Sequence, residues 1–144
     1  FHIFHKLNKK GLIAPAMLVS ELKINDEYDT VKPTSTLVEG AKKVLGINRG
    51  VLVGVDDKGQ PLGTLSDSHI LMALAKSLDC RNETCESHMN SNILSIKLSD
   101  NIKQISEKMK ISKPDAVVVE DDSNTFRGYF SPNDYREALL SLSS

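Results

Sequence analysis

Hydrophobic positions along the chain follow two different periods, and the changes between them predict strands and helices. Short apolar runs bounded by turn residues, at Val51–Val55 and Ala116–Val119, are typical of buried strands. Apolar residues three and four positions apart predict helices instead, one from about Thr36 and one from about Asp100. Thr36 and Glu39 have the spacing of a capping box, which supports a helix start there.

Turn residues after each buried strand predict a hairpin, at Asp56–Gly59 and again at Asp121–Asn124. The same reasoning gives the remaining elements: extended pieces at Tyr28–Lys32 and Ile93–Lys97, returning strands at Pro61–Leu65 and Phe126–Phe130, and final helices at about Asp67–Leu78 and Pro132–Leu142.

This order of elements occurs twice. Residues 20–74 align with residues 85–139 without a gap, and identical pairs such as Gly63 with Gly128 and Ser66 with Ser131 fall at turns. Each β-α-β-β-α unit alone leaves one sheet face uncovered. We therefore expect an α+β fold in which two repeats pack with pseudo-twofold symmetry. The expected division is a leader or linker at 1–17, a first repeat at 18–80 and a second at 81–144.

The composition fits a globular protein and excludes several function classes. Of 144 residues, 40% are hydrophobic and 26% charged, and the net charge of −1 gives no general attraction to nucleic acid or to anionic membranes. No apolar run approaches the ~18 residues of a membrane span. We expect a cytoplasmic protein without nucleic-acid or membrane contact. Because the chain starts with Phe, we expect a piece of a longer protein.

Two groups of residues resemble metal ligands only superficially. Cys80 and Cys85 lie near His88, but no second cysteine pair completes a tetrahedral set, so reduced thiols are the preferred interpretation. His2 and His5 have no carboxylate or third ligand nearby in the sequence, which favours a solvated leader. We predict no metal site.

The segment 126–135 combines features of a strand, a sharp turn and a helix start. Ser131 suits an N-cap, Pro132 the first helical position, and Asp134 the acid of a capping box. Free amides at such a helix start favour anions. A cap with no further role is the alternative interpretation.

The doubled unit, with Gly63-Thr-Leu-Ser66 and Gly128-Tyr-Phe-Ser-Pro-Asn-Asp134 ending each sheet, resembles a tandem pair of CBS domains (a Bateman module) over about residues 18–142. The resemblance implies a regulatory sensor without a cofactor. It would bind AMP, ADP, ATP or S-adenosylmethionine in the cleft between the repeats. It also implies a homodimer. Because the final helices carry more apolar residues than one face on a sheet requires, we expect the contact to form through them, around Ile70–Leu74 and Tyr135–Leu139.

The resemblance also implies individual roles. Ser131 would contact phosphate, Asp134 the ribose hydroxyls and Tyr129 the base. The other repeat would supply the rest of the wall: Ile24, Asp29, Arg49 and Gly50. Arg49 either adds charge at the phosphate or is a solvated loop residue.

A second site is implied at Ser66, Thr64 and His69, walled by Met89, Leu94 and Pro114. His69 stands where the motif has Asp, and a neutral imidazole offers one acceptor instead of two oxygens. We expect this site to be empty, weaker or selective for another ligand.

Two other functions are alternatives to the sensor. A ligand-free module for dimerisation and interaction would differ from the sensor by not binding nucleotides. An enzyme is disfavoured because the sequence has no nucleophile–base pair, no Gly-rich phosphate loop with Lys and no metal cluster.

Overall fold

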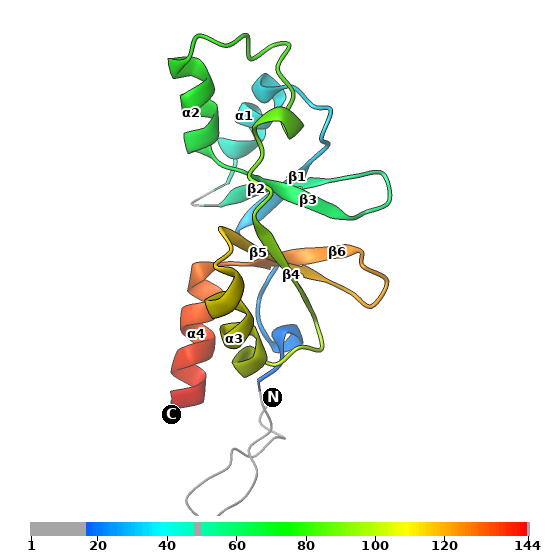
Figure 1. Ribbon diagram of the computed structural model, residues 1–144, viewed down its shortest axis with the longest axis vertical. Coiled ribbons are helices and arrows are strands. Elements are labelled where there is room, and N and C mark those ends of the chain that lie inside the picture. Colours follow the sequence, from blue (N-terminus) through cyan, green and yellow to red (C-terminus); the bar gives the residue numbers. More distant parts are fainter. Residues whose placement is uncertain (1–16, 48–49, 144) are drawn as a thin grey trace, which may run out of the picture.

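Each repeat begins with a strand that pairs in parallel with the central strand of a three-stranded sheet. The computed structural model describes residues 17–47 and 50–143 (Figure 1). The sheets have the orders β1-β2-β3 and β4-β5-β6. Their strands are β1 (Tyr28–Val31), β2 (Val51–Val55), β3 (Pro61–Leu65), β4 (Ile93–Lys97), β5 (Ala116–Glu120) and β6 (Phe126–Phe130). In both sheets the last two strands are antiparallel. The predicted strands are confirmed to within one residue.

Four α-helices follow the predicted order, and none of the described helices is long and apolar enough to cross a bilayer. They are α1 (Leu37–Val44), α2 (Asp67–Ala75), α3 (Ile102–Ser112) and α4 (Pro132–Ser143), with short 3-10 turns η1 (Val19–Glu21) and η2 (Glu86–His88). The predicted end of α2 at Leu78 is wrong. Ser77 has a φ of 59°, so the chain turns away there and the Leu78 amide donates to the Ala73 carbonyl.

The first helices of the two repeats have side-chain caps. Thr36 Oγ1 accepts from the Glu39 amide at 3.2 Å, and Glu39 Oε1 accepts from the Thr36 amide at 3.0 Å, which confirms the capping box. In the second repeat the cap is Asn101 and not Asp100, because Asn101 Oδ1 accepts from the Gln104 amide at 2.9 Å.

The repeat extends to the hairpins. Asp56 Oδ1 accepts from the amides of Lys58 and Gln60, and Asp121 Oδ1 accepts from those of Ser123 and Thr125. Each hairpin also has a strand irregularity, after Gly54 and after Val119. The two turns are each stabilised by an aspartate, and these aspartates are 65 positions apart, which confirms the repeat.

The two sheets lie next to each other in the middle of the molecule, and the helices cover their outer faces (Figure 1). Leu52 and Leu65 face α1 and α2 in the core of the first repeat. Val53 and Val118 point to the faces of their sheets that are turned away from the helices, and both are also fully buried. The central strands are therefore buried on both faces, as the apolar runs predict.

Each repeat receives a segment that precedes the other repeat in the sequence. We name residues 17–27 the first arm and residues 80–92 the second arm. The first arm packs Met17 and Val19 into the core of the second repeat, and the Val19 amide donates to the Asp100 carbonyl. The second arm packs Cys85 into the core of the first repeat. This exchange brings residues of both arms to the ends of the sheets.

Candidate functional site

The turn between β6 and α4 forms a buried, reciprocally bonded helix start. The Ser131 amide donates to Asp134 Oδ2 at 2.9 Å, and the Asp134 amide donates to Ser131 Oγ at 3.1 Å. Both side chains are buried, with exposures of 2% for Ser131 and 4% for Asp134. The predicted capping box is confirmed, and it fixes a hydroxyl and a carboxylate side by side at a helix N-terminus.

The Asp134 carboxyl lies in an environment that opposes its ionisation. Burial raises the pKa of this carboxyl, hydrogen bonding from the Ser131 amide and the Ser131 side chain lowers it, and the nearby carboxylates of Asp26 and Glu27 raise it again, with a net upward direction. Burial also raises the pKa of the Tyr129 hydroxyl, with further contributions from Glu27 and Asp134. Keeping a carboxyl group here costs stability, which is common where a group serves binding.

The first arm runs past this turn and supplies its opposite wall. The Ile24 carbonyl accepts from the Tyr129 amide at 2.9 Å, which ties the arm to β6. Beyond it, Glu27 Oε1 accepts from Asn133 Nδ2 at 2.9 Å. Between arm and helix lies a concavity of about 540 Å³, lined by Lys23, Asp26, Glu27, Asn133, Asp134, Arg136 and Glu137. The space is mostly polar and contains charges of both signs.

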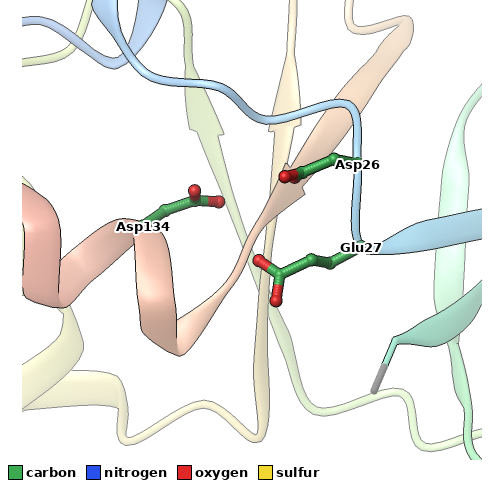
Figure 2. Close-up of side chains that lie close together, drawn as sticks. All are labelled: Asp26, Glu27 and Asp134. Atoms are coloured by element: carbon green, nitrogen blue, oxygen red, sulfur yellow. The ribbon is translucent and has the colours of Figure 1, made fainter. Parts of the chain in front are cut away.

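Three carboxylates converge in this concavity. Oxygens of Asp26, Glu27 and Asp134 all lie within 4.8 Å of one another, and Figure 2 shows the three side chains pointing toward a common space from the arm and from α4. Carboxylate oxygens suit Mg²⁺ and Ca²⁺. These three carboxylates are therefore the place at which to test the prediction of no metal site, by adding Mg²⁺ or Ca²⁺.

The other residues implied for the wall have different positions. Gly50 lies against the arm, where a Cβ would stand 2.4 Å from the Glu27 carbonyl oxygen. Asp29 is exposed on β1, and its Oδ1 accepts from the Thr30 amide at 2.7 Å. Arg49 lies outside the described residues. Ile24, Tyr129, Ser131 and Asp134 are thus brought together, with Gly50 behind the arm.

The equivalent turn of the first repeat is capped by an imidazole. The Ser66 amide donates to His69 Nδ1 at 2.9 Å, so this nitrogen is the acceptor and the neutral ring carries its proton on Nε2. Ser66 Oγ lies 3.1 Å from the same nitrogen and 2.7 Å from Ser68 Oγ. Because the backbone amide already uses the acceptor of the ring, His69 has no counterpart of the second carboxylate oxygen.

The second arm covers the strand that leads to this turn. The Thr64 amide donates to the Asn90 carbonyl at 3.0 Å, and the Asn90 amide donates back at 2.8 Å. Met89 lies over Gly54 and Gly63. Leu94 packs against the core of the second repeat. Pro114 shares a cavity of about 230 Å³ with Tyr129 and Ser131, so it also lies beside the other turn.

The cysteines have contacts of structural thiols. Cys85 is fully buried, its Sγ donates to the Thr36 carbonyl at 3.3 Å, and burial raises its thiol pKa. His88 Nε2 instead lies 3.0 Å from Glu83 Oε1. A protonated, buried thiol is a poor metal ligand. His2 and His5 lie outside the described residues.

Sequence reasoning missed Asp26, Glu27 and Asn133. The first two lie between the predicted wall residues Ile24 and Asp29, but at the 65-residue offset they correspond to Ser91 and Asn92, so the repeat does not single them out. Their importance depends on the path of the arm across β6. Asn133 stands inside the turn motif, and its side chain reaches residue 27, which is 106 positions away.

Comparison with known proteins agrees with the two-repeat fold. A family model described as CBS domain matches residues 19–76 and 85–141. No curated protein matches the sequence. A solved CBS domain protein from Pyrobaculum aerophilum, complexed with AMP, is 26% identical, with a TM-score of 0.70 over 88% of this chain and 98% of that chain.

Two further solved structures share the fold at lower identity. One is a CBS domain pair in complex with 5-methylthioadenosine and S-adenosyl-L-methionine, 23% identical, with a TM-score of 0.68 over 90% of this chain and all of that one (100%). The other is CBSX2 in complex with AMP, 16% identical, with a TM-score of 0.65 over 88% of this chain and 98% of that chain.

Proposed function

This chain belongs to the CBS domain family, and we propose that it is a regulatory module that senses an adenosine-containing ligand. The ligand lies across the turn between β6 and α4, where Asp134 lines the concavity beside the first arm and Tyr129 and Ser131 line the cavity that they share with Pro114. The module regulates an attached or partner enzyme or transporter and catalyses no reaction itself. The resemblance identified from the two turns supports this proposal, as do the adenosine ligands in the solved relatives.

The observation that carries the proposal is the buried carboxyl of Asp134 at the start of α4. A carboxylate accepts from both hydroxyls of a ribose, and the adjoining hydroxyl and helix N-terminus suit a polar 5′ group. Tyr129, whose backbone amide donates to the Ile24 carbonyl of the arm, offers an apolar surface to the base. A helix cap does not need a carboxyl group, since His69 caps the other turn, so the buried carboxyl of Asp134 favours a role in binding.

Binding is tested by calorimetry and thermal shift with AMP, ADP, ATP and S-adenosylmethionine. A ligand at 100 times its Kd is expected to add about 2.7 kcal/mol to the free energy of unfolding. Asp134→Ala is expected to weaken binding about tenfold or more, because buried ribose hydroxyls lose their acceptor. His69→Ala is the matched control at the other turn and is expected to leave this binding nearly unchanged. If binding survived Asp134→Ala and were lost in His69→Ala, the ligand site would lie at the turn of the first repeat, and the assignment to Asp134 would be wrong.

We also propose that the module is a homodimer and that it is cytoplasmic. The exposed apolar residues Leu71, Met72 and Leu74 on α2 support the dimer, since side chains of this size are usually covered when they cluster. The free thiols of Cys80 and Cys85 support a reducing compartment. A dimer without nucleotide binding would favour the alternative function, a ligand-free interaction module.

A further inference from the structure

The charges around Asp134 bear on which adenosine ligands the proposed site accepts. The concavity is lined by four carboxylates, those of Asp26, Glu27, Asp134 and Glu137, and by two cations, Lys23 and Arg136. Three of the carboxylates lie within 4.8 Å of one another (Figure 2). When all are ionised, the wall nearest to Asp134 is negative.

Of the two carboxylates that the arm supplies, Glu27 is the one held by a hydrogen bond to α4. Its Oε1 accepts from Asn133 Nδ2 at 2.9 Å, next to Asp134 on the first turn of α4. The arm that supplies it is fixed three residues earlier by the bond between the Ile24 carbonyl and the Tyr129 amide. Asp26, in contrast, is exposed and has a long contact of 3.9 Å with the exposed Lys23. Such an exposed pair contributes little.

We propose that Glu27 determines specificity and that the site prefers adenosine ligands with a neutral or cationic 5′ substituent over those with a 5′ phosphate. This inference rests on the proposed function, in which Asp134 binds the ribose hydroxyls. A 5′ substituent then lies one ribose ring away from Asp134 and its two acidic neighbours. That separation is shorter than the Debye length of about 8 Å at physiological ionic strength, so the carboxylates repel a phosphate and attract a sulfonium or ammonium group.

The environment of Asp134 supports the preference for a neutral or cationic 5′ substituent. Its carboxyl is already disfavoured as an anion by burial and by Asp26 and Glu27. A bound phosphate would add a further negative charge to the same partly desolvated space. A thioether would add none, and a sulfonium would offset part of the existing repulsion. The ligand class is therefore that of 5′-thio and 5′-sulfonium adenosines.

The test is a calorimetric comparison of AMP, 5′-methylthioadenosine and S-adenosylmethionine on the whole chain. The variants are Glu27→Gln and, as the matched control, Glu107→Gln, which removes the same charge from an exposed position on α3. The wild type is expected to bind 5′-methylthioadenosine about tenfold more tightly than AMP. Glu27→Gln is expected to reduce that preference several-fold and to weaken S-adenosylmethionine. Glu107→Gln is expected to keep the wild-type ratios. If Glu27→Gln does not fold, Asn133→Ala replaces it, because this change removes the donor that holds Glu27 and is expected to reduce the preference in the same direction.

Three results would overturn the proposal. Equal affinities for AMP and 5′-methylthioadenosine in the wild type, unchanged in Glu27→Gln, would remove the selectivity and leave the proposed function intact. A rise of Tm with Mg²⁺ alone that Glu27→Gln abolishes would show that the cluster binds a metal instead. Binding of no adenosine compound would remove the proposed function, and the selectivity with it.

Discussion

At the scale of single residues, the two turns show the same backbone solution with different chemistry. Asp134 and His69 occupy equivalent positions, and each accepts the amide of the serine three residues before it at 2.9 Å. The carboxylate keeps a second oxygen for a ligand, whereas the imidazole has used its one acceptor. A cap can therefore be provided by either side chain, and only Asp134 adds a binding group.

Asp134 should reduce the stability of the free protein at neutral pH. Its pKa is raised in the folded state, so the folded state holds the proton more strongly than the unfolded state. Stability from this group is full below the ordinary carboxyl pKa of 3.8 and is lost as the pH rises through the folded value. Asp134→Asn keeps the acceptor for the Ser131 amide without the charge. We expect it to raise the free energy of unfolding more at pH 7 than at pH 4, measured by urea denaturation. An equal change at both pH values would contradict this.

The capping spacing of Ser131 and Asp134 is visible in the sequence because both partners lie within four residues. The carboxylates that surround Asp134 are not visible in the same way. Asp26 and Glu27 reach it only because the first arm crosses β6 at Tyr129, more than one hundred positions later in the chain. Local patterns predict elements and caps, but they do not predict which distant loop lies beside them.

At the scale of elements, the arms lie so close to the strands that a Cβ would meet arm backbone at Gly128 and at its counterpart Gly63. A Cβ on Gly128 would stand 2.6 Å from the Ile24 carbonyl oxygen, which is backbone. A Cβ on Gly54 would stand 2.2 Å from Met89 Cε, which is the end of a flexible side chain. The first obstacle is fixed by the hydrogen bond to Tyr129, whereas the second can change rotamer.

Gly128→Ala and Gly54→Ala are therefore expected to differ. Gly128→Ala has to displace the arm and should cost about 1–3 kcal/mol of unfolding free energy, as overpacking of a rigid core does. Gly54→Ala should cost clearly less because Met89 can move. Urea denaturation of both variants measures the difference. A larger loss in Gly54→Ala would show that Met89 is held more firmly than the arm at Ile24.

At the scale of the whole molecule, the two repeats depend on each other twice. Their sheets share a buried layer that contains Val53 and Val118, and each core includes residues from the arm that precedes the other repeat. The back-to-back packing could be predicted because one repeat cannot cover its own sheet. The arm exchange could not be predicted, because nothing in the sequence shows which core Met17, Val19 and Cys85 pack into. Met17, the first described residue, thus packs on the second repeat, and the same arm continues to the candidate ligand site.

The outer side of the molecule leads to the remaining prediction. Both α2 and α4 lie on the left side of the view in Figure 1, and α2 exposes Leu71 by 63% and Leu74 by 57%. These two residues are three positions apart and share one helix face, while Ile70 and Ala73 fill the core side. The hydrophobic pattern of α2 is therefore apolar on both sides, which a helix on a sheet alone does not need.

We expect the wild type to be a dimer through this face and the double variant Leu71→Glu with Leu74→Glu to be a monomer. Burying two carboxylates in an apolar contact is unfavourable, whereas both positions are exposed in the single chain, so folding is retained. Light scattering at high micromolar concentration should show the mass fall to the 15.9 kDa of one chain, with an unchanged circular dichroism spectrum. Leu45→Glu is the control, because Leu45 is 88% exposed but belongs to the C-cap of α1 and not to α2. A monomeric wild type, or a double variant that stays dimeric, would show that this face of α2 is not the interface.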